Sequence, residues 1–371
     1  VVGADGGVQS VQVLEADTGD WEVEHCLLEV GRGMRFAKPK GGPVADFTLP
    51  RECPARRQSP RWPEEEADEE EAETLEAIHA DNLDDVSGEL AAHHALAGDS
   101  ERAYRFYRRA AELAMDRHAL VHAEAMFDAA LSYAPDDPVV RFDLLAEQSR
   151  VFYSSLQLSP WRSNLDEQEV LLATMRQPDP RLNLTLHVNR SRYFEINGEA
   201  KATMEAALVA IAIAEQLGEG GALALAYQAL ASGHWKESRM AEAKPLFGQS
   251  AAYARDVGNV TIEATSLELY AASGMFSGMP SAQILEILNR TYQLAEKNGD
   301  LQQMCSLFNK FGYLRIASGM GNFDSAENDY QRGIALSGEI GNLSIKEVLL
   351  SNLGVCFTNK GDYRQALATL N

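Results

Sequence analysis

Four turns of similar composition recur at nearly constant spacing in the second half of this 371-residue chain. A glycine at such a turn is typical of the left-handed residue that ends an α-helix. A fixed period of this size predicts stacked units that share one continuous hydrophobic core. The turns read QLGEGG, DVGNVT, KNGDLQ and EIGNLS, and their glycines, spaced by 40, 41 and 42 residues, are Gly218, Gly258, Gly299 and Gly341.

The residues around these glycines predict where helices begin. Asn259, Asp300 and Asn342 each follow a turn glycine, and their side-chain oxygens can cap the next helix. Pro178 lies 40 residues before the first glycine and extends the register by one unit. The alternative, an unrelated run of amphipathic helices, requires four glycines to fall in register by coincidence. The predicted helix–turn–helix units are 181–217, 220–257, 260–298, 301–340 and 343–371.

The last unit carries the most specific pattern, SNLGVCFTNKGDYRQALATL. Its order L-G-x-x-F, G-D-Y and A-x-x-x-L places a large, a small and an aromatic residue before a turn, then Ala and a large residue. Gly354 and Ala366 are expected where the two helices approach most closely, because larger side chains would hold the helices apart. The hairpin resembles a tetratricopeptide (TPR) repeat. This resemblance implies an all-α superhelix, a solenoid of antiparallel helical hairpins.

A second resemblance lies upstream, in HHALAGDSERAYRFYRRAAELAMDRHALVHAEAMFDAALSYAP. This run is similar to the start of the helical repeat region in bacterial signal-transduction ATPases with numerous domains. Related transcriptional activators and nucleotide cyclases share that region. The resemblance covers about residues 74–371. The chain has no GxxxxGK[ST] run, so the nucleotide site of that family is not carried over.

The chain divides into three parts on these patterns. Residues 1–73 are expected to be irregular or poorly ordered and end in the acidic run EEEADEEEAE, which could begin a helix. Strand-like alternation within 1–62 leaves a small β element or the tail of an upstream domain as alternatives. Residues 74–180 hold the first TPR-like helices, and 181–371 hold the regular repeats. The chain lacks an initial Met and stops inside a helix, so a fragment is expected.

Charge and cysteine usage narrow the functional classes. The net charge is −22, and the stretch from Glu64 to Glu101 holds 15 acidic residues and no Lys or Arg. Direct nucleic-acid binding is therefore disfavoured, because phosphate binding needs a basic surface. The four cysteines show no CxxC spacing, which favours a reducing cytoplasm over a disulfide framework. No apolar run reaches about 18 residues, so no membrane span is expected.

Histidines and short motifs give no catalytic or metal site. His118 and His122 are four residues apart near Glu124, but they lack the HExxH order and a third ligand at recognisable spacing. His93 and His94 cannot share a helix face and are expected on the helix surface. No Ser/His/Asp set is recognisable, so no cofactor is expected and this chain is not expected to be an enzyme itself.

The inner groove of a TPR array is the expected binding site, because the first helix of each hairpin lines it. Trp and Arg are favoured anchors at interfaces. The alternative for Trp235 is a core-capping role, with the other side chains merely solvated. Basic residues on the inner wall of an acidic chain would favour an acidic ligand. The principal candidates for this inner groove are Arg192, Gln228, Trp235, Lys236, Phe311 and Arg315. Ser232, Glu268 and Thr358 are also expected to point into it.

The sequence therefore predicts a protein–protein interaction scaffold. It would be the sensor or partner-binding TPR arm of a bacterial signalling or transcription-regulatory protein in the cytoplasm. The expected partner is a protein, a peptide or a small effector, whose binding biases active and inactive states. The alternative is the regulatory part of a larger enzyme, an ATPase or nucleotide cyclase, with its catalytic domain outside this sequence.

Overall fold

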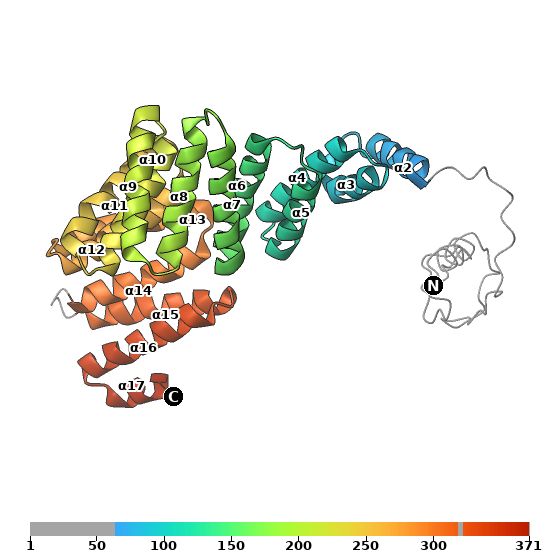
Figure 1. Ribbon diagram of the computed structural model, residues 1–371. Helices are drawn as coiled ribbons and strands as arrows, with labels where there is room; N and C mark the ends of the chain where they lie inside the picture. The colour runs from blue at the N-terminus through green and yellow to red at the C-terminus, as the bar shows by residue number, and fades with distance from the viewer. Residues whose placement is uncertain (1–63, 318–321, 371) are drawn as a thin grey trace, which may run out of the picture. The chain divides into compact units, whose positions relative to one another are not determined.

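The computed structural model describes residues 64–317 and 322–370, which are helical and contain no β-strand (Figure 1). The first part of this range holds one 3₁₀ turn and helices of 10 to 18 residues. Its elements are α2 (Glu64–Ile78), the 3₁₀ turn η1 (Leu83–Val86), α3 (Ser87–Leu96), α4 (Ser100–Asp116), α5 (Leu120–Tyr133), α6 (Pro138–Ser155) and α7 (Leu158–Thr174).

The regular array consists of helices of similar length, and each helix packs against the next along the chain. They form the antiparallel pairs α8–α9, α10–α11, α12–α13, α14–α15 and α16–α17, so the predicted all-α solenoid is confirmed. The bounds are α8 (Pro180–Ile196), α9 (Ala200–Leu217), α10 (Gly220–Lys236), α11 (Met240–Asp256), α12 (Val260–Phe276), α13 (Ser281–Asn298), α14 (Leu301–Ala317), α15 (Phe323–Glu339), α16 (Leu343–Lys360) and α17 (Tyr363–Leu370).

The acidic run at the end of the N-terminal segment begins a helix, which the sequence left open. Helix α2 begins at Glu64, so the run from Glu64 to Glu73 is helical rather than irregular. Residues 1–63, with the strand-like stretches, lie outside the described residues. The division into 1–73, 74–180 and 181–371 stays a prediction.

The turn glycines have the expected backbone conformation. Gly218, Gly258, Gly299 and Gly341 have φ between 68° and 73°, a region that L-residues with side chains rarely adopt. The predicted caps are also present. The side chains of Asn259, Asp300 and Asn342 accept hydrogen bonds of 3.1, 2.9 and 3.1 Å from backbone amides three residues on. The period therefore arises from a repeated helix stop followed by a helix cap.

Replacing one of these caps should weaken the array measurably. Asn342→Ala removes the acceptor for the backbone amide of Ile345 at the start of α16. We expect the free energy of unfolding to fall by about 1 kcal/mol, measured by urea denaturation. Asn289→Ala, an exposed position in the middle of α13, is the matched control and should change it by less than about 0.5 kcal/mol.

The helix pairs meet over a row of small residues. Ser191, Ala231, Ala271, Gly312 and Gly354 occupy equivalent positions on the first helices of the five pairs, and each is buried. Ala366 on α17 is also buried, in the same hydrophobic cluster as Leu353 and Phe357. The close approach expected at Gly354 and Ala366 agrees with this burial.

The histidines differ in part from expectation. His94 is 1% exposed, its ring stacks on Phe106 with centroids 5.5 Å apart, and its Nε2 lies 3.2 Å from a Glu76 oxygen. The expected surface position is therefore wrong for His94, because the start of α4 and the end of α2 cover it. His118 has φ of 57° in the turn before α5, so it does not share a helix with His122.

No helix within the described range is both long and apolar enough to cross a bilayer.

Candidate functional site on the first helices

The first helices of successive pairs lie closer together than the second helices do. Contacts join α6 to α8, α8 to α10, α10 to α12, α12 to α14, and α14 to α16. The second helices α9, α11, α13 and α15 do not pack against one another to a similar extent. Closer spacing on one side bends a stack toward that side, so the first helices line its inner face.

Helices α4 and α6 are the first helices of two further pairs, α4–α5 and α6–α7. Polar or aromatic side chains bridge every consecutive pair of first helices from α4 to α16. We call this set the first-helix ladder. It consists of Arg108–Glu147, Tyr153–Arg192, Glu195 with Ser232 and Lys236, Gln228–Ser266, Glu268 with Gln303, Ser306 and Lys310, and Asn309–Asn352.

Aromatic and charged contacts form the ladder between α6, α8 and α10. The guanidinium carbon of Arg192 lies 3.7 Å from the ring centroid of Tyr153, a cation–π contact. Lys236 donates a hydrogen bond to the backbone oxygen of Glu195. Burial raises the pKa of the Glu195 carboxyl, while the hydrogen bond from Ser232 and the nearby cations oppose that rise. The Glu195 carboxyl thus lies in a partly desolvated part of the inner face.

The best-connected group of the ladder joins α12 to α14. The Glu268 carboxylate accepts hydrogen bonds from Ser306 (2.6 Å), Lys310 (2.5 Å) and Gln303 (3.2 Å). Glu268 is only 8% exposed, yet three donors offset the desolvation of its charge. This group fixes the orientation of two neighbouring first helices.

Amide side chains form the remaining steps of the ladder. Gln228 donates to the hydroxyl of Ser266 across 3.4 Å, and Asn352 donates to the Asn309 oxygen across 2.7 Å. Gln228, Asn309 and Asn352 are half-buried. A side-chain amide carries both donor and acceptor groups, so it can pair with a peptide backbone of any sequence.

The structure places only some of the predicted site residues on the ladder. Phe311 is 6% exposed and belongs to a core cluster, and Arg315 forms an ion pair with Asp329 on the second helix α15 at 2.5 Å. Thr358 is exposed and donates to the Gly354 oxygen of its own helix. The predicted residues that the ladder does bring together are Arg192, Gln228, Ser232, Lys236 and Glu268.

Trp235 is half-buried and takes the core-capping role that was the alternative. Its ring meets Phe247 edge-on at 6.4 Å and Phe276 at 6.1 Å, above the buried Ala231 and Ala243.

We expect Trp235→Ala to lower the free energy of unfolding by about 2 kcal/mol, less than for a fully buried Trp. Thermal denaturation checks this. If the melting temperature did not change, Trp235 would not be a core residue and would again be a candidate groove contact.

Acidic groups lie beside the basic residues of the inner wall, and the expected acidic ligand stays a prediction. Carboxylates accompany the cations of the ladder: Glu147 contacts Arg108, Glu268 contacts Lys310, and the Glu195 carboxyl lies near Arg192 and Lys236. Because these charges are balanced locally, the wall offers hydrogen-bonding groups rather than a positive field.

Asn309, Lys310 and Asn352 were missed in the sequence. Asn309 precedes the small residue Gly312 by three positions, as Glu268 precedes Ala271 and Gln228 precedes Ala231. Lys310 and Asn352 each stand two positions before a small residue, Gly312 and Gly354. Alignment of the repeats on their small residues is the signal that could have identified Asn309.

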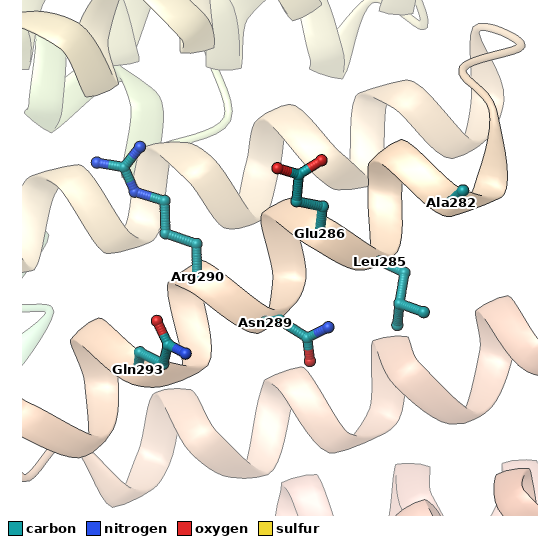
Figure 2. Close-up of a pocket in the computed structure, with 6 residues that line it drawn as sticks. All are labelled: Ala282, Leu285, Glu286, Asn289, Arg290 and Gln293. Atoms are coloured by element: carbon teal, nitrogen blue, oxygen red, sulfur yellow. The ribbon is translucent and has the colours of Figure 1, made fainter.

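The second helix α13 carries an open hollow of about 540 Å³. Figure 2 shows its lining side chains spread along one face of this helix rather than converging on a point. Arg290 reaches back to the Glu263 carboxylate at 2.6 Å. The hollow lacks a convergent polar group, so α13 supplies control positions for the experiments below. The lining residues are Ala282, Leu285, Glu286, Asn289, Arg290 and Gln293.

Comparisons with known proteins identify the fold. No protein-family model matches the sequence, and no curated protein matches it significantly. Among solved structures, a Rap protein complexed with competence and sporulation factor is 15% identical, with a TM-score of 0.57 over 80% of this chain and 77% of that one. The apo quorum sensor NprR from B. thuringiensis is 13% identical, with a TM-score of 0.55 over 72% and 74% of the two chains.

A third similar structure is a signal-transduction ATPase with numerous domains and a TPR sensor, from Pyrococcus horikoshii. It is 12% identical, with a TM-score of 0.58 over 81% of this chain and 45% of that one. At these identities the likeness shows the fold alone. The described chain has the fold of TPR-type helical repeat proteins.

Proposed function

We propose that this chain is the partner-binding arm of a signalling regulator and that the first-helix ladder binds an extended peptide or protein segment. The observation that carries the proposal is the continuity of the ladder. Each first helix from α4 to α16 is joined to the next by side chains on the inner face. A segment lying across several first helices would meet polar groups at each step.

The chemistry of the ladder supports a peptide rather than a nucleic acid. Its amides and hydroxyls can pair with backbone N–H and C=O groups, and its charges are largely balanced. Structural neighbours agree with this assignment: one was solved with competence and sporulation factor, and another is described as a quorum sensor. A bacterial, cytoplasmic setting is part of the proposal.

Regulation would follow from binding across several repeats. Each repeat contacts chiefly its neighbours, so small changes in spacing between first helices add up along the stack. A ligand that favours one spacing shifts the population toward it. A second candidate function, the sensor of a larger ATPase, is favoured by the match to the multidomain ATPase with a TPR sensor, of which this chain covers 45%.

The test selects binders from a random twelve-residue peptide library with the full chain. The dissociation constant of the best peptide is then measured for the wild type and for Asn309→Ala/Asn352→Ala. We expect about a 10–100-fold loss for this double variant, as for one or two lost hydrogen bonds. Asn289→Ala on α13 is the matched control and should bind as the wild type does. Equal affinity of the double variant would contradict the assignment, as would a library that yields no binder.

A further inference from the structure

A histidine of α3 and two carboxylates of α2 meet at the start of the described chain. Figure 1 shows where these two helices lie. His93 Nδ1 lies 3.1 Å from an oxygen of Asp68 and 3.4 Å from an oxygen of Glu71. One ligand atom from each residue lies within 4.8 Å of the other two. Asp68 and Glu71 are three residues apart on α2, so they share one helix face.

These distances fit the edges of a metal coordination polyhedron. Zinc binds His nitrogen and carboxylate oxygen at about 2.0–2.2 Å, which places neighbouring ligands of a tetrahedral site roughly 3.3–3.5 Å apart. The two edges from His93 are close to that separation before any ion is placed. Glu71 is two-thirds exposed, so a fourth position would open to water.

The local charge also favours a cation. The stretch from Glu64 to Glu101 has no Lys or Arg. Among the described residues, the ion pairs of Asp68 and Glu71 are made with His93 alone. Other acidic groups near the start of the chain have arginine partners, such as Asp84 with Arg109. The carboxylates beside His93 therefore have no permanently charged cation beside them, and a divalent metal ion would supply that positive charge.

We infer that Asp68, Glu71 and His93 form a zinc-binding site that fastens α2 to α3. The mixed nitrogen and oxygen donors suit zinc, whereas magnesium and calcium prefer oxygen alone. Helix α2 has little apolar surface with which to pack against the rest of the array. Ala72 is fully buried, but Ile78 at its end is 69% exposed. Binding of the ion to the folded pair alone would stabilise the attachment of α2.

The test titrates the chelator-treated full chain with zinc sulfate against a competing chromophoric chelator. The variants are His93→Ala and Asp68→Asn, and the matched controls are His122→Ala and Glu69→Gln, both at exposed positions. We expect the wild type and the controls to bind one equivalent of zinc. The two site variants should bind it about tenfold more weakly or worse, since even substitutions outside the ligand set lower metal affinity about 10–100-fold. Magnesium at equal concentration should not displace this equivalent.

A second measurement distinguishes a bound ion from scattered surface binding. Zinc should slow proteolysis within α2 in the wild type and in His122→Ala, and should leave its rate unchanged in His93→Ala. The inference is overturned if His93→Ala and the wild type bind zinc with the same affinity and stoichiometry. It is also overturned if magnesium displaces the ion, because the carboxylates alone would then account for binding.

Discussion

Replacing Glu268 with alanine is expected to lower the free energy of unfolding by about 2–4 kcal/mol, somewhat below the cost of breaking a fully buried ion pair. The change removes the acceptor for three donors on α14 and leaves the Lys310 ammonium, 22% exposed, without its carboxylate. Urea denaturation of the full chain measures the effect. The same change should loosen α12 against α14 and so weaken peptide binding.

Two further variants separate this effect from a general loss of charge. Glu286→Ala removes an exposed carboxylate from α13 and should change the free energy of unfolding by less than about 0.5 kcal/mol. Lys310→Met should recover part of the stability lost in Glu268→Ala, because it removes the unpaired ammonium. If Glu268→Ala were as stable as Glu286→Ala, the ladder would not couple these helices.

Replacing Gly312 with alanine is expected to lower the free energy of unfolding by about 3 kcal/mol, at the upper end of the range for overpacking. An added Cβ would lie 2.5 Å from the Tyr330 ring, closer than real contacts allow. Tyr330 is 1% exposed and its ring is rigid, so neither side can move away easily. The loss arises although alanine is the better helix former.

Other repeats suggest a second substitution that should restore the stability lost in Gly312→Ala, and a control variant. The preceding pair places Ala271 and Leu288 together in one cluster, at the positions of Gly312 and Tyr330. Gly312→Ala combined with Tyr330→Leu should therefore be more stable than Gly312→Ala alone. Gly248→Ala, whose added Cβ would lie 3.4 Å from Tyr270, should be neutral or stabilising. If Gly312→Ala and Gly248→Ala were equally stable, the close contact between α14 and α15 would not lie at Gly312.

Local chemistry made much of the array predictable from the sequence. A positive φ at Gly258 and a side-chain cap at Asn259 depend on neighbouring residues only, so they can be read one turn at a time. The small residue Gly354 was recognised because its hairpin follows the TPR order closely. Helix pairing followed from these features, because short turns force consecutive helices to lie antiparallel.

The inner face was predicted only in part, because the rotation of each helix depends on its packing. In α10 and α12 the structure places the predicted residues Gln228 and Glu268 on the ladder. In α14, apolar residues cover more than one face, and Phe311 was mistaken for a groove residue although it is buried in the core. Arg315 turns toward Asp329 for the same reason. The partners of Gln228, Glu268 and Arg315 lie about 14 to 42 residues away in the chain, beyond the reach of local patterns.

The central claim is that a partner lies on the first helices. The most direct measurement is photo-crosslinking with a peptide selected by the full chain, synthesised with a benzophenone side chain at each position in turn. Mass spectrometry then identifies the crosslinked residues. Crosslinks on α10, α12, α14 and α16, close to Gln228, Glu268, Asn309 and Asn352, are the predicted result. Crosslinks confined to the second helices α9, α11, α13 and α15 would contradict it.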